Sequence, residues 1–110
     1  MEDLKNHVEH IANSLTNPPW DEWNEGRDVD NEGEFSAFDY LQDALDIEYI
    51  VSSRNEYLGA RVLVAFGGPN IWINTQTNQV EGYWWGDRCI LSYNNDAMDL
   101  DGALSELYSC

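Results

Sequence analysis

Carboxylates recur at helical spacing in the middle of the chain, at Asp39, Asp43 and Asp46. Side chains three and four residues apart lie on the same side of a helix, with Cβ atoms about 5–6 Å apart. A row of negative charges at that interval is similar to a phosphate backbone, so a positively charged nucleic-acid-binding groove would accept it. The alternative is a solvated helix face whose carboxylates contact only water. The spacing therefore predicts either a surface for a basic partner or an inert acidic face.

The residues before this row have the spacing of a calcium-binding loop. The twelve residues from Asp28 to Asp39 resemble the EF-hand loop, with acids at positions one, three, five and twelve and glycine at position six. The ligands would be Asp28, Asp30, Glu32, Glu34 through its carbonyl oxygen, and Asp39. The segment departs from the motif at Glu32, Phe35 and Asp39, and Pro18-Pro19 stands where the entering helix should be. A calcium-binding module is therefore an alternative hypothesis, and a chance match in so acidic a chain is the competing explanation.

Neither the histidines nor the cysteines form a pattern typical of catalysis. His7 and His10 are three residues apart on a predicted helix, but no third metal ligand is near them in the sequence. Residues 67–70 lack the lysine of a phosphate-binding loop, and no serine stands in a nucleophile elbow. Cys89 falls in an apolar strand pattern and Cys110 is the last residue, so we expect two free thiols. The sequence predicts a protein that is not an enzyme and needs no cofactor.

Aromatic residues lie within the acidic segment and in the sheet. Trp20 and Trp23 either anchor a protein interface, since tryptophan is enriched among interface hot spots, or fasten the acidic loop to the sheet. Tyr83, Trp84 and Trp85 are consecutive, so in a strand they point to both faces of the sheet and cannot all enter one core. Tryptophans at a strand edge leave both a monomer and a homodimer open.

The negative charge of the chain is concentrated in one segment. The formal net charge is −16, of which residues 21–48 contribute −10 through eleven acids and one arginine. Residues 49–93 are neutral, with three arginines and three acids. Crowded like charges destabilise the compact state, so solubility alone does not account for this segregation. We therefore expect the segment from Asp21 to Glu48 to meet a positively charged partner.

Hydrophobic periodicity assigns these residues to helices and strands. Apolar residues at helical spacing predict helices over residues 3–16, 35–45 and 97–108, with residues 20–33 as an acidic loop. A period of two, with β-branched and aromatic residues, predicts strands over residues 48–53, 57–66, 71–74, 79–85 and 88–93. Phe38, Leu41 and Leu45 should face the core from the second helix. Asp96 should cap the last helix, and Asp99 should favour its dipole.

The expected architecture is a single α+β domain over residues 1–110. It has two N-terminal helices, an antiparallel sheet of four to five strands and a C-terminal helix, with the helices on one face of the sheet. No apolar run approaches the roughly 20 residues of a membrane span, and the amino terminus lacks the basic start of a signal peptide. We therefore expect a cytoplasmic protein that does not bind membranes.

In charge, size and architecture the whole chain resembles the small acidic inhibitors made by phages and mobile elements, which include anti-CRISPR, anti-restriction and other DNA-mimic proteins. The resemblance implies a stoichiometric inhibitor that binds a basic nucleic-acid-binding protein, such as a nuclease or CRISPR effector, and not nucleic acid itself. The residues it implies as substitutes for phosphates are Asp21, Glu22, Glu25, Asp28, Asp30, Glu32, Asp39, Asp43 and Asp46, with Trp20 and Trp23 beside them. An immunity protein that neutralises one cognate nuclease toxin through an acidic face is the alternative.

Overall fold

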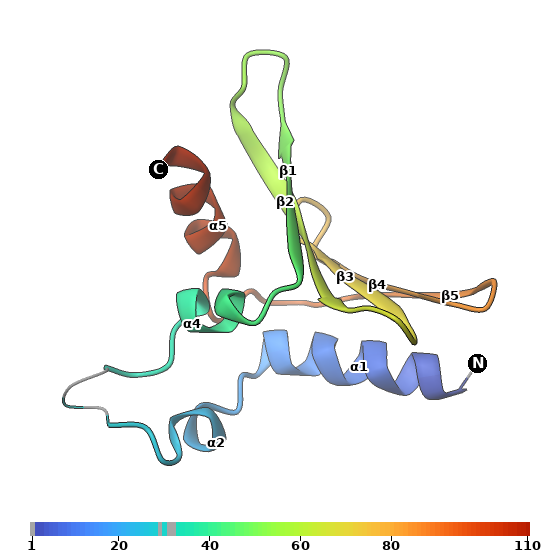
Figure 1. The fold of residues 1–110 in the computed structure, drawn as a ribbon, viewed down its shortest axis with the longest axis horizontal. Helices are drawn as coiled ribbons and strands as arrows, with labels where there is room; N and C mark the ends of the chain where they lie inside the picture. Colours follow the sequence, from blue (N-terminus) through green and yellow to red (C-terminus); the bar gives the residue numbers. More distant parts are fainter. Residues whose placement is uncertain (1, 29, 31–32) are drawn as a thin grey trace.

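The chain folds into a five-stranded antiparallel sheet with helices packed against one face (Figure 1). The computed structural model describes residues 2–28, 30 and 33–110. In chain order the elements are α1 (Glu2–Thr16), α2 (Trp20–Asn24), α4 (Ala37–Gln42), β1 (Asp46–Val51), β2 (Tyr57–Ala65), β3 (Asn70–Asn74), β4 (Gln79–Trp84), β5 (Asp87–Ser92) and α5 (Leu100–Ser109). This arrangement confirms the predicted α+β class. Within the described residues, no helix combines the length and the apolar composition that crossing a lipid bilayer requires.

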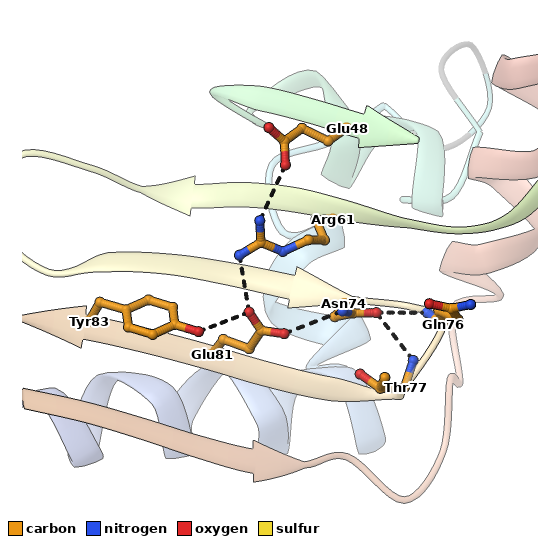
Figure 2. A network of polar contacts seen from close by, with 7 residues as sticks. All are labelled: Glu48, Arg61, Asn74, Gln76, Thr77, Glu81 and Tyr83. Carbon is orange, nitrogen blue, oxygen red and sulfur yellow. Dashed lines mark hydrogen bonds and ion pairs between the residues drawn. The ribbon is translucent and has the colours of Figure 1, made fainter. Parts of the chain in front are cut away.

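The sheet is a meander whose two faces differ in chemistry. The strand order is β1-β2-β3-β4-β5, and each neighbouring pair is antiparallel. Val62 pairs with Ile73, which pairs with Val80, and these buried residues form the centre of the face that the helices cover. Successive side chains alternate along a strand, so Trp72 and its partner Glu81 lie on the opposite face. Figure 2 views the sheet from that opposite face, with the helices behind it.

Helix α1 lies directly on β4 because the strand has a glycine at the crossing point. Leu4, Val8 and Leu15 recur on one side of the helix and are fully buried. A Cβ atom added at Gly82 would stand 2.9 Å from Leu4 Cδ1 and closer still to Val8 Cγ2. Any larger residue at position 82 would therefore push the helix away from the sheet.

Helix α5 contacts β2 and covers the other half of the same face. Leu100 and Leu104 are fully buried, as the apolar periodicity predicts. The Asp96 carboxylate accepts hydrogen bonds from the amides of Leu100 at 2.8 Å and Asp101 at 3.0 Å, and Asp99 is the N-cap residue. Asp96 therefore caps the helix as predicted, whereas Asp99, predicted to lie inside the helix, is its N-cap residue and accepts the Gly102 amide. The helix begins at Leu100 and not at residue 97, because the backbone of Asp99 is left-handed, with φ of 57°.

The predicted helix over residues 35–45 is wrong in its length. Helix α4 has only six residues. Its start is set by a capping box, in which Ser36 donates its amide and its hydroxyl to the Asp39 carboxylate. Its end is set by the sheet, because Leu45 donates its amide to the Leu63 carbonyl where β1 begins. Pairing with β2 overrides the helical periodicity at this point.

The shorter helix changes which side chains are buried and how the carboxylates are arranged. Phe38 is 42% exposed and Leu45 is 60% exposed, so they do not face the core as predicted. Asp39 lies in the first turn of α4, Asp43 is the C-cap residue and Asp46 belongs to β1. The three carboxylates therefore do not form the predicted row along one helix.

Candidate functional site

Most carboxylates of the acidic module, which we define as residues 20–48, are exposed to solvent. The exposed ones are Asp21, Glu22, Glu25, Asp28, Asp30, Glu34, Asp43, Asp46 and Glu48. Asp39 is half-buried, and Glu32 lies outside the described residues. Seen in Figure 1, α2 and the segments beside it extend away from the sheet on one side of the molecule. The module is therefore an accessible surface of high negative charge density.

An aromatic cluster fastens the acidic module to the body of the protein. The centroid of the Trp23 ring lies 4.9 Å from that of Phe35 and 5.8 Å from those of Tyr40 and Trp20. Trp23 belongs to α2, a short helix within the predicted acidic loop, and it packs against the core. The Asn24 side chain accepts the Phe35 amide at 2.7 Å and so ties α2 to the segment before α4. Trp23 therefore anchors α2 to the body of the protein, as one of the two predicted roles requires. Trp20 is 37% exposed at the edge of the cluster.

Arg27, the single basic residue in the sequence of the module, joins its two halves. Its Nε donates to the Gly33 carbonyl at 2.7 Å, and its Nη2 lies 3.3 Å from both carboxylate oxygens of Asp39. Its guanidinium carbon lies 6.0 Å from the centroid of the Phe35 ring. Hydrogen bonds from Ser36 and the charge of Arg27 hold the pKa of Asp39 below its ordinary value. Asp39 therefore acts inside the module, where it stabilises the loop.

The described residues of the predicted calcium loop do not come together as ligands. Among the residues that the structure describes, no group of three or more acidic, histidine or cysteine side chains is placed to hold a metal ion. Asp39, the expected twelfth ligand, is bonded to Arg27 and Ser36. Glu32 lies outside the described part of the chain. The calcium hypothesis gains no support from this geometry.

A small hollow lies against the aromatic cluster. Its volume is about 300 Å³, and it is lined by Trp23, Phe35, Tyr40, Asp43, Ala44 and Val64. Burial raises the pKa of Tyr40 to about 12, so its hydroxyl is neutral at physiological pH. Trp23 and Asp43 are among the predicted site residues, whereas Phe35 and Tyr40 are not. The sequence feature that indicates their role is the density of aromatic residues among the acids of this segment.

On the face of the sheet opposite the helices, one arginine links four strands (Figure 2). Arg61 of β2 donates to Glu48 of β1 at 3.2 Å and to Glu81 of β4 at 3.1 Å. Its guanidinium carbon lies 4.4 Å from the centroid of the Trp72 ring of β3, a cation–π distance. Charge and ring contacts thus connect β1, β2, β3 and β4 across the face opposite the helices.

Glu81 is the centre of this network (Figure 2). Its side chain is only 12% exposed, and besides Arg61 it accepts hydrogen bonds from Tyr83 at 3.2 Å and Asn74 at 3.3 Å. The Asn74 oxygen in turn accepts two amides of the β3–β4 turn. Burial, with the charge of Glu81, raises the pKa of Tyr83. Donors and acceptors match within the network, so it stabilises the sheet and gives the neutral segment a structural role.

The three consecutive aromatics of β4 have three different environments. Tyr83 joins the network on the uncovered face, and Trp84 packs against the core. Trp85 is 85% exposed and, with Gly86, forms the two-residue turn between β4 and β5. Both turn residues have positive φ, 53° and 82°, as in a type I′ turn. A bulky residue is strained in this region, and so exposed a side chain adds little packing to offset the strain.

The histidines and cysteines occupy ordinary positions. His7 and His10 are exposed on α1, where they line a shallow surface hollow with Asp3 and Asn6. Both cysteines are free thiols: Cys89 is partly buried against the core, and Cys110 is exposed. None of these side chains lines the hollow formed with Phe35 and Asp43, but His10 lines a neighbouring one that shares Trp23 and Tyr40.

Comparison of the chain with protein-family models, with curated proteins and with solved structures found no match. The acidic module, its hollow and the neutral segment of residues 49–93 are therefore the features from which a function can be proposed.

Proposed function

We propose that this protein is a non-catalytic inhibitor that binds, by mimicry of DNA, the basic groove of a defence nuclease or CRISPR complex in the host cytoplasm. The segregation of charge supports this proposal, because the acidic module has nine exposed carboxylates, two of them at the start of β1, whereas residues 49–93 have a neutral sequence. A groove that binds phosphates presents arginine and lysine side chains, which also bind carboxylates. The partner is a protein and not nucleic acid, because a net charge of −16 repels phosphates.

The carboxylates best suited to replace phosphates are the exposed ones. Asp21 and Glu22 lie on α2, and Glu25 follows directly. Asp43 and Asp46 are exposed on the other side of the loop. Attraction between this surface and a basic groove would raise the association rate and would weaken as salt screens the charges.

Neutralising one patch of carboxylates tests the proposal. The variant Asp21→Asn/Glu22→Gln/Glu25→Gln removes three charges from the acidic module. The matched control, Asp3→Asn/Glu9→Gln/Glu106→Gln, removes three exposed charges from α1 and α5. Each protein is added to restriction endonucleases and CRISPR effector complexes that hold a fluorescent DNA duplex, and release of the duplex is measured at several salt concentrations.

We expect the unmodified protein and the control to displace DNA from at least one of these enzymes, with displacement falling as salt rises. The module variant should need a concentration about tenfold higher or more to release the same amount of DNA, since several charge pairs across the interface are lost. Equal inhibition by both variants, or no displacement from any enzyme, would contradict the proposal. Inhibition that excess DNA does not overcome would instead favour an immunity protein that binds away from the groove.

A further inference from the structure

The hollow beside the aromatic cluster has the composition of a site for a cationic side chain. The rings of Trp23, Phe35 and Tyr40 line it together with the Asp43 carboxylate. The planes of Phe35 and Tyr40 are tilted by 45° and 46° to that of Trp23, so the three rings do not form a flat stack. Aromatic faces attract cations through the ring quadrupole, and proteins recognise ammonium groups with such clusters. The lining residues include one acid and no base.

The size of the hollow limits what it can hold. Ligand pockets usually have volumes of roughly 300–1,000 Å³, and this hollow, at about 300 Å³, fits one side chain or a small ion. A second hollow of about 270 Å³ shares Trp23, Tyr40 and Val64 with it and is also lined by Glu22 and His10. Of the two hollows, only the first has a carboxylate among its lining residues and no basic or histidine side chain.

The protein itself twice places a guanidinium over an aromatic ring beside a carboxylate. Arg27 lies over Phe35 while it contacts Asp39. Arg61 lies over Trp72 while it contacts Glu81. Phe35 belongs both to the first of these pairs and to the lining of the hollow. The hollow therefore offers an arginine of another protein the same combination of an aromatic ring and a carboxylate.

We infer that this hollow binds an arginine side chain of the basic partner. The guanidinium would lie against the rings of Trp23, Phe35 and Tyr40, and its charge would be met by Asp43. Arginine is favoured over lysine because its planar group stacks on aromatic faces and is more weakly hydrated than an ammonium group. The net charge of −10 over residues 21–48 would attract a basic surface toward the hollow. The identity of the partner rests on the proposed function, whereas arginine binding is a property of the hollow itself.

The test is an NMR titration of the isotope-labelled protein with acetyl-Gly-Arg-Gly-amide. Matched peptides carry citrulline, norleucine or lysine in place of arginine. The indole N–H signals of the five tryptophans report where a peptide binds. Work at about 0.15 M salt limits attraction between distant charges, because the screening length is then about 8 Å. Trp85 is the internal reference, since it is 85% exposed on the β4–β5 turn, at the other end of the molecule from the acidic module (Figure 1).

We expect the arginine peptide to shift the Trp23 signal saturably and to leave the Trp85 signal unchanged. Citrulline, the neutral isostere, should bind at least about fivefold more weakly because it lacks the charge. Asp43→Asn should weaken arginine binding about two- to fivefold, the effect of one exposed charge pair, whereas Glu106→Gln on α5 should not change it. Asp43 is exposed at the end of α4, so its substitution leaves the fold intact.

Three results would overturn the inference. Equal binding of the norleucine peptide would make the hollow an apolar contact site, and stronger binding of the lysine peptide would exclude the assignment to arginine. Equal shifts of all the tryptophan signals, or no saturable shift of Trp23, would exclude a site at the hollow. Binding of arginine without displacement of DNA from any nuclease would leave the inference standing and refute the proposed function. Displacement of DNA without arginine binding would support the proposed function and refute the inference about the hollow.

Discussion

The substitution Arg27→Met removes the charge that joins the two halves of the acidic module while keeping much of the side-chain volume. Arg27 Nη2 lies 3.3 Å from both carboxylate oxygens of Asp39, and its Nε lies 2.7 Å from the Gly33 carbonyl oxygen. Without these contacts, the half-buried Asp39 carboxylate keeps Ser36 as its hydrogen-bond donor but loses the neighbouring positive charge. The loop between α2 and α4 should therefore open more easily.

The expected size of this effect follows from the geometry of Arg27. Two unit charges 3.3 Å apart attract by about 5 kcal/mol at an effective dielectric constant of about 20. The two side chains are 20% and 21% exposed, so desolvation and screening reduce the net contribution to about 1–2 kcal/mol. The charged hydrogen bond to Gly33, which is exposed, adds about 1 kcal/mol. Opening of the loop should become easier by about 2–3 kcal/mol.

Native-state hydrogen exchange measures this opening at the amides of Phe35 and Ser36, which are bonded to Asn24 and Asp39. A change of about 2–3 kcal/mol corresponds to exchange roughly 30- to 150-fold faster. The control is Arg54→Met in the exposed β1–β2 turn, because it removes the same charge from another part of the surface. Exchange at these amides that is no faster in Arg27→Met than in the control would refute the role assigned to Arg27.

The effect of Arg27→Met should also depend on pH in a defined direction. The folded structure lowers the pKa of Asp39 below its ordinary value of 3.8, through Ser36 and then Arg27. A carboxylate with a lowered pKa contributes stability above its ordinary value, and that contribution is lost as pH falls through the folded value. The difference in loop opening between the two proteins should be complete at neutral pH and shrink below about pH 4. A constant difference down to acid pH would contradict an interaction between charges.

Two further substitutions test the packing of the sheet and the strain in its exposed turn. Gly82→Ala should lower the free energy of unfolding in urea by about 1–3 kcal/mol, because the added methyl group would overlap Leu4 and Val8 of α1. Gly68→Ala, where the space is open, should change little, and a loss equal to that of Gly82→Ala would contradict the packing described here. Trp85→Asn should raise the stability by about 1 kcal/mol, because asparagine suits the positive φ of 53° and little packing is lost from a residue that is 85% exposed. A lower melting temperature of this variant would show that Trp85 makes a contact on which the fold depends.

Local periodicity predicts which side chains of a regular helix are buried. It fails where a segment pairs with another that is distant in the sequence. Leu4, Val8 and Leu15 are spaced at helical intervals, and their burial beneath α1 follows from that spacing alone. Leu45 continues the helical pattern of its segment equally well, but its amide is bonded to Leu63 of β2. Nothing in the residues around Leu45 indicates that partner. Tertiary pairing therefore decides where α4 ends.

The candidate site is predictable from the sequence in its charge but not in its geometry. Charge segregation is visible because net charge adds along the chain, whatever the fold. The Arg27–Asp39 pair joins residues twelve positions apart, and the hollow adds Val64 of β2 to residues of α2 and α4. Asp39 consequently looks like one more carboxylate of an acidic row until the structure places Arg27 against it. The spacing of the acids supplies no information about either contact.

Contacts within the acidic module affect how much free energy a partner must spend to order it. Ordering side chains on binding costs about 0.5–1.5 kcal/mol for each long side chain that is immobilised. In this protein the bond from Phe35 to Asn24 and the pair of Arg27 with Asp39 join the two ends of this segment without any partner. Self-repulsion from a net charge of −10 over residues 21–48 opposes that order, and Arg27 counteracts the repulsion from inside. An acidic tail of the same composition would lack these contacts and would be extended by its own charge, so it would have to be ordered by its partner. Here, contacts within the protein already hold Asn24, Arg27, Phe35 and Asp39, so the side chains that would be ordered by a basic partner are fewer.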